Sequence, residues 1–389
     1  MSSLFKAEGM MAIAISEFLE DYEIYFFSTL ELKYRFQEFE DVVNSVDVIH
    51  WLVNRSSVSQ KALNVASTKK QITTIHHLCP QEHEKLESAK ESTFIHVVAK
   101  EWKDLIDKDQ SLTVILARLG IDTNQFSKGS IRNLKKHIPV IGMMGFYPGA
   151  HNRKRPDIAF KALALLKQKS IKFKVLLQGA GWEDYKEQLE NLDVPYTILN
   201  YSSKEESDAF FKKVDVFLCT SDFEGGPLPV LEAMASGIPV VSTEVGVAQE
   251  ILINGGGFLC EKGNSKQIAH ALEELINNRD LYAAHSDKAK ENIKELDWGN
   301  LKEEYSEMYN RFSVDIFKES LISLSAKNQR KKELLHSKLQ EGMSLLYYGD
   351  KKEGLKKLNK IKFDSSISLK RKLDTLKRVM KFSIQGVRT

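Results

Sequence analysis

Short apolar strands alternate with polar loops and helical segments from Val140 to Ser242, and this alternation limits the possible folds more than any other feature. Residues 140–145 and 214–219 are two such apolar runs, and each is followed by polar residues and then by a helical pattern. Strands connected through helices lie parallel, because a crossover needs a dozen residues or more. The sequence therefore predicts an α/β layer with a doubly wound sheet.

A second block of the same kind precedes residue 138. Residues 10–19 have a helical pattern, and four segments have the composition of strands: 22–28, 46–52, 71–76 and 93–98. Two blocks predict two facing Rossmann-like domains, with ligands at the carboxyl ends of the strands. The expected domains are residues 1–137, residues 138–312 with a final helix that crosses back, and an α-helical basic extension at 313–389.

Composition excludes several classes of protein. The chain has 389 residues, of which 42% are hydrophobic and 28% charged, as in ordinary globular proteins. Its three cysteines lie far apart, without the spacing of a zinc site, and no apolar run approaches the roughly 20 residues of a membrane span. We expect a cytoplasmic protein without a metal site.

The extension carries most of the positive charge. Residues 327–389 have a net charge of +12, whereas the whole chain has +3. Leu369, Leu373, Leu376 and Met380 form an apolar stripe on its last predicted helix. We expect peripheral association with an anionic membrane surface at the inner face. The alternative is a stripe packed on the protein itself or on a second subunit. Nucleic acid is not expected, because interleaved aromatic residues are lacking.

The segment 221–241 carries the clearest chemistry. It contains Glu224 and Glu232, which flank glycines at the start of a predicted helix. Glycines let backbone N–H groups approach a ligand, and a helix N-terminus favours an anion such as a diphosphate. Two carboxylates beside that anion can accept hydrogen bonds from sugar hydroxyls. Taken alone, Glu232 could equally be a solvated helix residue and Glu224 a loop carboxylate near the helix dipole.

This segment closely resembles the signature of GT-B glycosyltransferases of the family-4 type. Other motifs follow in that family's order, namely Gly145 before a basic loop, residues 178–181 after a strand, and Gly246 with Glu250. The resemblance implies the GT-B fold, two facing Rossmann-like domains with the nucleotide in the second.

The resemblance also implies roles for individual residues. Glu232 would bind the ribose hydroxyls and Glu224 would face the transferred hexose, as a catalytic residue. Lys154 would pair with the diphosphate, and the backbone around Gly226 and Leu228 would hold sugar or phosphate.

The basic loop departs from the family pattern. Phe146 stands where the family often has Arg, so a second cation must come from elsewhere, from Arg153 or Arg155. A solvated basic loop is the alternative interpretation.

A histidine completes the predicted site. Residues 72–76 resemble the family's strand that ends near the donor sugar, so His76 is a candidate to contact the sugar. It could also be a loop or core histidine, and so could its neighbour His77. His50 is expected to be structural. Asp107 and Asp109 have a D-x-D spacing, but their polar surroundings indicate a solvated pair.

The resulting hypothesis is a retaining hexosyltransferase that uses a nucleotide-diphosphate sugar as donor and a glycan, lipid-linked or protein-linked hydroxyl as acceptor. The resemblance implies no metal and no cofactor. The alternative is a non-catalytic GT-B scaffold or partner subunit, since residues 2–6 make a poor first strand.

Overall fold

The computed structural model describes most of the chain up to residue 312. The described residues are 7–19, 22–28, 31–80, 82–126, 137–145, 153–199 and 204–312. Residues 45–314 form one compact unit, and residues 1–44 belong to another. The basic extension and its apolar stripe lie outside the described residues, as does Phe146. The predicted boundaries at 137 and 312 stay predictions.

The first 44 residues contain helices only, among the residues described there. They are α1 (Ala7–Phe18), α2 (Glu31–Tyr34) and the start of α3 (Phe36–Ser45). Arg35 joins the last two through ion pairs of 2.8 Å to Glu31 and 2.6 Å to Glu38. The strand predicted at 22–28 is wrong, since this segment is irregular. Aromatic and β-branched composition favours a strand only where a neighbouring strand supplies hydrogen bonds.

The compact unit 45–314 begins with a four-stranded parallel sheet in the order β1-β2-β3-β4. Three of its strands agree with predicted segments, but the short β4 was not predicted. Its strands and the helices between them are β1 (Val48–Trp51), η2 (Arg55–Ser57), α4 (Gln60–Ala66), β2 (Lys70–Ile75), α5 (His83–Ala89), β3 (Phe94–Val97), α6 (Lys100–Ile106), β4 (Val114–Leu116) and η3 (Thr123–Gln125).

A six-stranded parallel sheet follows, in the order β10-β9-β8-β5-β6-β7. Its strands are β5 (Val140–Met144), β6 (Lys174–Gln178), β7 (Tyr196–Leu199), β8 (Val216–Cys219), β9 (Val240–Thr243) and β10 (Gly257–Cys260). The chain runs outward from β5 to β7 and returns to the other side of β5 with β8. The carboxyl ends of β5 and β8 therefore form the switch point where doubly wound sheets bind ligands.

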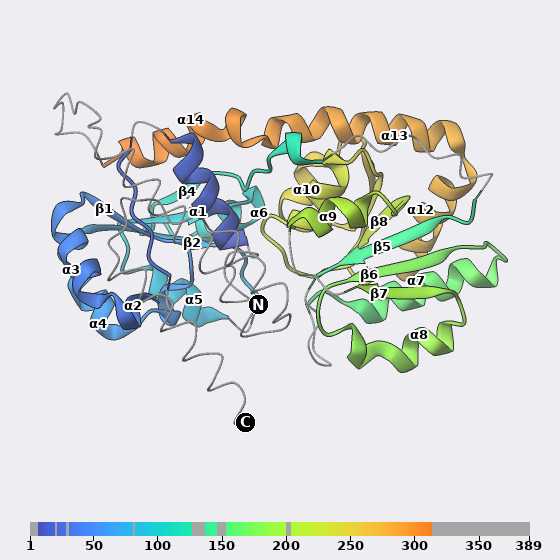
Figure 1. Ribbon diagram of the computed structural model, residues 1–389, viewed down its shortest axis with the longest axis horizontal. Coiled ribbons are helices and arrows are strands. Elements are labelled where there is room, and N and C mark those ends of the chain that lie inside the picture. Colours follow the sequence, from blue (N-terminus) through green and yellow to red (C-terminus); the bar gives the residue numbers. More distant parts are fainter. Residues whose placement is uncertain are drawn as a thin grey trace, which may run out of the picture. The chain divides into compact units, whose positions relative to one another are not determined.

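Helices cover both faces of this sheet (Figure 1). The core against one face includes Leu163 of α7, Leu189 of α8 and Leu272 of α12, all fully buried. The other side carries the aromatic contact of Phe211 in α9 with Phe217. The helices are α7 (Pro156–Gln168), η4 (Trp182–Tyr185), α8 (Lys186–Leu192), α9 (Lys204–Phe211), α10 (Leu228–Ala235), α11 (Gly246–Ile251), α12 (Ser265–Asn277), α13 (Arg279–Asn292), η5 (Ile293–Leu296) and α14 (Trp298–Asn310).

The last described helix, α14, contacts the residues that follow β4. Tyr305 donates a 3.0 Å hydrogen bond to the carbonyl of Arg118, whose side chain pairs with Glu304 at 2.5 Å. The ring of Trp298 lies where a side chain on Gly120 would have to go. Among the described residues, no helix is long and apolar enough to cross a membrane.

Candidate active site

Glu224 lies in the loop after β8 and is the centre of an ionic cluster. Its Oε1 atom is 2.7 Å from Lys154 Nζ and 2.7 Å from an Arg153 guanidinium nitrogen. The hydroxyl of Ser221 donates a further hydrogen bond of 2.9 Å to the same oxygen. The structure thus brings together three of the predicted site residues from the ends of β5 and β8.

The charge state of Glu224 follows from these contacts. Burial alone would raise the pKa of this carboxyl, but the positive charges of Lys154 and Arg153 outweigh burial and hold the pKa well below its usual range. Burial alone would lower the pKa of Arg153, but the neighbouring Glu224 carboxylate outweighs burial, so the pKa of Arg153 is raised. The cluster therefore stays ionised at neutral pH, with two cations against one carboxylate.

The loop that carries these cations is fixed to the end of β8. Thr220 donates hydrogen bonds of 2.9 and 3.0 Å to the carbonyls of Lys154 and Arg155. The N–H of Asp222 donates to the carbonyl of Arg153 at 2.7 Å. These bonds set the positions of Lys154 and Arg153 relative to Glu224.

Arg155 is turned away from that cluster. Its guanidinium pairs at 2.9 Å with Asp222 and at 2.9 Å with Asp157. Its backbone is left-handed, with φ of 51° and ψ of 54°, which is uncommon outside glycine. Of the two cations proposed from the sequence, Arg153 is thus the one beside Glu224, and Arg155 holds the loop.

Glu232 lies in α10, directly after this loop, and is 8% exposed. Its Oε2 accepts a 2.7 Å hydrogen bond from the buried hydroxyl of Ser207 in α9. Pro227 precedes the helix and makes no side-chain cap, while Pro229 has no N–H. Among the first residues of α10, Leu228 therefore offers a backbone donor at the positive end of the helix.

The four-stranded sheet reaches the same loop. A side chain on Gly225 would lie 1.8 Å from the carbonyl oxygen of His76, and one on Gly226 would meet Leu119 at 2.7 Å. The indole of Trp102 donates a 2.8 Å hydrogen bond to the carbonyl of Glu224. The glycines are thus required by close packing against residues that follow β2 and β4.

His76 lies at this contact, and its proposed contact with the donor sugar stays a prediction. Its Nε2 atom lies 3.0 Å from the carbonyl of Leu52, so this nitrogen donates. In the neutral ring Nδ1 is then an acceptor, and this buried atom has no hydrogen-bond partner.

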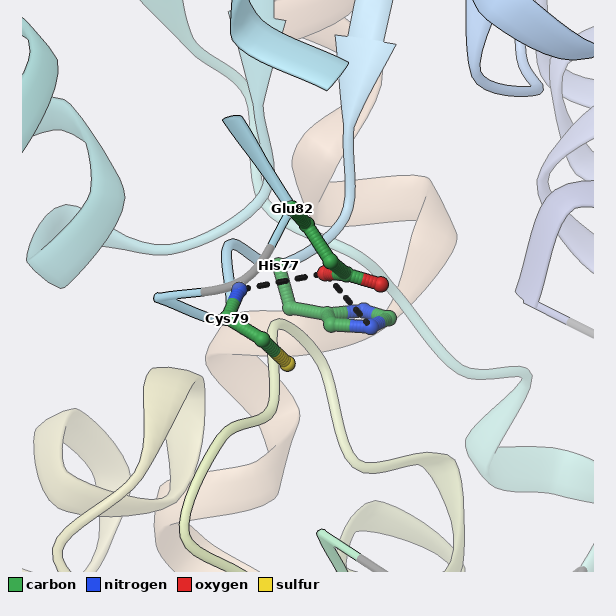
Figure 2. Close-up of side chains that lie close together, drawn as sticks. All are labelled: His77, Cys79 and Glu82. Atoms are coloured by element: carbon green, nitrogen blue, oxygen red, sulfur yellow. Dashed lines mark hydrogen bonds and ion pairs between the residues drawn. The ribbon is translucent and has the colours of Figure 1, made fainter. Parts of the chain in front are cut away.

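A polar cluster that the sequence analysis missed follows His76. The ligand atoms of His77, Cys79 and Glu82 lie within 4.8 Å of one another (Figure 2). Burial, helped by the charge of Arg153, lowers the pKa of His77 to about 3. Burial, helped by Glu82, raises the pKa of Cys79 to about 11. The H-x-C-x-x-E spacing could have identified this cluster.

The ammonium group of Lys85 already contacts two side chains of that cluster. Lys85 Nζ lies 2.5 Å from Glu82 Oε2 and 3.4 Å from His77 Nε2. A divalent cation would have to displace this ammonium group and would then lie near the charge of Arg153. The donor set therefore suits a lysine better than a metal ion. The D-x-D pair is also unlike a ligand site, because Asp107 pairs with Lys103 and Asp109 with Ser111.

His50 belongs to a buried hydrogen-bond chain inside the four-stranded sheet. Its Nδ1 is 2.7 Å from the hydroxyl of Tyr309, and its Nε2 is 2.7 Å from that of Thr74. Thr74 is 2.9 Å from Nδ1 of His96, whose Nε2 donates to the carbonyl of Ala117 at 2.8 Å. His50 is thus structural, and the chain connects β1, β2 and β3 with α14.

Comparison with known proteins defines the class. Residues 142–292 match the sequence profile of the family described as Glycosyl transferases group 1. An Anabaena protein, Alr3699/HepE in complex with UDP, has a similar fold, with a TM-score of 0.61 at 17% identity over 80% of this chain and 98% of that one. The fold is thus α/β with two parallel sheets, as in GT-B glycosyltransferases.

Curated relatives match less than half of the chain. An uncharacterized glycosyltransferase of Haemophilus influenzae is 31% identical over 34% of this chain and 39% of its own length. The poly(ribitol-phosphate) alpha-N-acetylglucosaminyltransferase of Staphylococcus aureus is 27% identical over 42% of this chain and 34% of its own length. The chain thus spans well under half the length of either.

Proposed function

We propose that this protein is a retaining glycosyltransferase that transfers a hexose from a nucleotide-diphosphate sugar to a hydroxyl group of a glycan, lipid-linked or protein-linked acceptor. The observation that carries the proposal is the cluster of Glu224, Lys154 and Arg153 at the switch point of the six-stranded sheet, with Glu232 in the helix that follows. UDP in the complex of the similar Anabaena protein supports a nucleotide donor.

Groups from the loop before α7 and from α10 would bind the donor. Glu232, already fixed by Ser207, would accept hydrogen bonds from the ribose hydroxyls. Lys154, Arg153 and the N–H of Leu228 would bind the diphosphate. Because both cations now pair with Glu224, the incoming diphosphate would share them with this carboxylate.

The same groups would promote the reaction. The bond between the anomeric carbon and the diphosphate oxygen breaks, and the acceptor oxygen bonds to the same face of the sugar while its proton passes to the departing phosphate. Negative charge grows on the leaving diphosphate, and Lys154 and Arg153 would stabilise it. Glu224 would face the positively charged sugar, and His76 would accept a hydrogen bond from a sugar hydroxyl. No residue is assigned as a covalent nucleophile.

Binding of a sugar nucleotide tests the donor assignment. Thermal unfolding should be followed with UDP-, GDP- and ADP-sugars, because a ligand of the native state raises the melting temperature by mass action. We expect an increase with at least one donor and a smaller increase with Glu232→Ala. The absence of any increase with the whole panel would contradict the proposal.

We further propose that residues 327–389 associate with an anionic membrane surface, where a lipid-linked acceptor would lie. The support is their net charge of +12, since each basic residue near anionic lipid contributes about 1 kcal/mol. Co-sedimentation with anionic liposomes, using the full chain and a chain ending at 326, tests this at low and high salt. Equal, salt-insensitive pelleting of both would contradict it.

A further inference from the structure

Gln178, the last residue of β6, has a buried side-chain oxygen without a hydrogen-bond partner. The residue is 2% exposed, and its Oε1 is one of the few orphaned side-chain atoms among the described residues. The backbone carbonyl of Gln178, in contrast, accepts hydrogen bonds from Gly145 and Trp182. A buried acceptor without a donor costs stability, so it needs an explanation, and a bound ligand that donates a hydrogen bond is one.

The position of Gln178 relates it to Glu232. Sheet register pairs Gln178 with Met144 on β5, and paired residues of parallel strands point to the same face. The sulfur of Met144 lies 3.9 Å from the hydroxyl of Ser207, which donates to Glu232 at 2.7 Å. Gln178 therefore lies on the same face and at the same edge of the sheet as Glu232.

The other face of β6 belongs to the core. Val175 and Leu177 pack there, and strand alternation points Gln178 away from them. Next to Gln178 the edge lacks side chains, because a side chain on Gly179 would lie 1.9 Å from the carbonyl oxygen of Gly145. Gln178 thus lies at the carboxyl edge of the sheet, beside the closely packed backbone of Gly145 and Gly179.

We propose that Gln178 binds the nucleobase of the donor, with Oε1 accepting a hydrogen bond from a ring N–H. This inference rests on the proposed function, in which Glu232 holds the ribose to which the base is attached. An amide presents an acceptor and a donor side by side, which matches a ring N–H next to a carbonyl. Uracil and guanine have that arrangement, whereas the rings of adenine and cytosine have no such N–H. A contact between Oε1 and a ring N–H therefore predicts a preference for uridine or guanosine diphosphates.

Gln178→Leu tests the inference, because leucine has a similar volume and removes the orphaned acceptor. Calorimetric titration with UDP, GDP, ADP and CDP should show that the unchanged protein prefers UDP or GDP. In the variant, affinity for the preferred nucleotide should fall about five- to tenfold, and its preference over ADP and CDP should shrink by the same factor. The ligand-free melting temperature should stay the same or rise, whereas a merely structural role would lower it.

Lys174→Leu is the matched control. Lys174 is exposed at the opposite end of β6, so its substitution should leave all four affinities unchanged. The inference is overturned if Gln178→Leu keeps the preference of the unchanged protein, or if the variant loses affinity for all four nucleotides equally. It is also overturned if the unchanged protein prefers ADP or CDP. If the unchanged protein binds none of the four, the proposed function falls together with the inference. Binding by the unchanged protein with an unaltered preference in the variant overturns the inference alone.

Discussion

Lys154 Nζ lies 2.7 Å from Glu224 Oε1, although 70 positions separate the two residues in the sequence. One follows β5 and the other follows β8, the two strands between which the chain reverses its direction of growth. The cation proposed to bind the donor's diphosphate thus contacts the carboxylate proposed to face the donor's sugar. Because the two pair, the Glu224 carboxylate already neutralises part of the positive charge that would attract a diphosphate.

Glu224→Gln should lower turnover without weakening donor binding. The amide keeps the shape of the side chain but frees Lys154 and Arg153 from their carboxylate, so the diphosphate meets less competition. We expect kcat to fall by about 10²- to 10³-fold, with KM for the donor unchanged or lower. Steady-state kinetics over a range of donor concentrations measures both values. A higher KM with normal kcat would contradict the role given to Glu224.

Glu232→Ala should act on donor binding instead. It removes the acceptor proposed for two ribose hydroxyls, and each charge-assisted hydrogen bond is worth about 1.5–3 kcal/mol. The dissociation constant of the nucleotide should rise at least about tenfold, which calorimetry can measure. Ser207→Ala is the control, because it removes one contact of Glu232 but leaves the carboxylate, and its effect should be smaller.

Asp222→Ala should weaken donor binding indirectly, through Arg155. Its carboxylate holds Arg155, whose left-handed backbone shapes the loop that carries Lys154 and Arg153. We expect KM for the donor to rise several-fold. Asp157→Ala removes the other partner of Arg155 at a more exposed position and should change KM less. Equal donor KM in Asp222→Ala and the unchanged protein would show that the loop is held without this pair.

Buried His96 should make the fold sensitive to mild acid. Burial, the largest effect, lowers its pKa to about 4, against about 6.5 in the unfolded chain. The unfolded chain therefore binds the proton first, so stability is full above pH 6.5 and is lost as pH falls towards 4. The contribution of this residue is on the order of 3 kcal/mol.

Urea unfolding at pH 7 and pH 5 measures this loss. His50 of the same hydrogen-bond chain also has a lowered pKa, through burial first and then the proximity of His96, and acts in the same direction. His96→Gln should therefore reduce the pH dependence without abolishing it. Identical free energies of unfolding at the two pH values would contradict the neutral state of both rings.

Much of the second sheet follows from the sequence because β5, β6, β8 and β9 are almost entirely buried and largely apolar. The apolar runs predicted at 140–145 and 214–219 contain β5 and β8, and Glu224 and Lys154 lie together beyond the ends of these strands. The aromatic segment 22–28 lacks a strand, since composition alone does not supply a hydrogen-bonding neighbour.

Other features depend on contacts between distant residues. The choice between Arg153 and Arg155 is decided by Asp222, which is far away in sequence and turns Arg155 aside. The cluster of His77, Cys79 and Glu82 depends on the path of the loop after β2. No local pattern determines where such side chains point, because packing against other elements sets their directions.

Release of nucleoside diphosphate tests the central claim most directly. The protein should be incubated with UDP-, GDP- and ADP-sugars and a mixture of hydroxyl acceptors, with the Glu224→Gln variant as a matched control. The account predicts release from at least one donor by the unchanged protein, and release at least about a hundredfold slower by the variant. Equal release by the two proteins, or none from any donor by the unchanged protein, would contradict it.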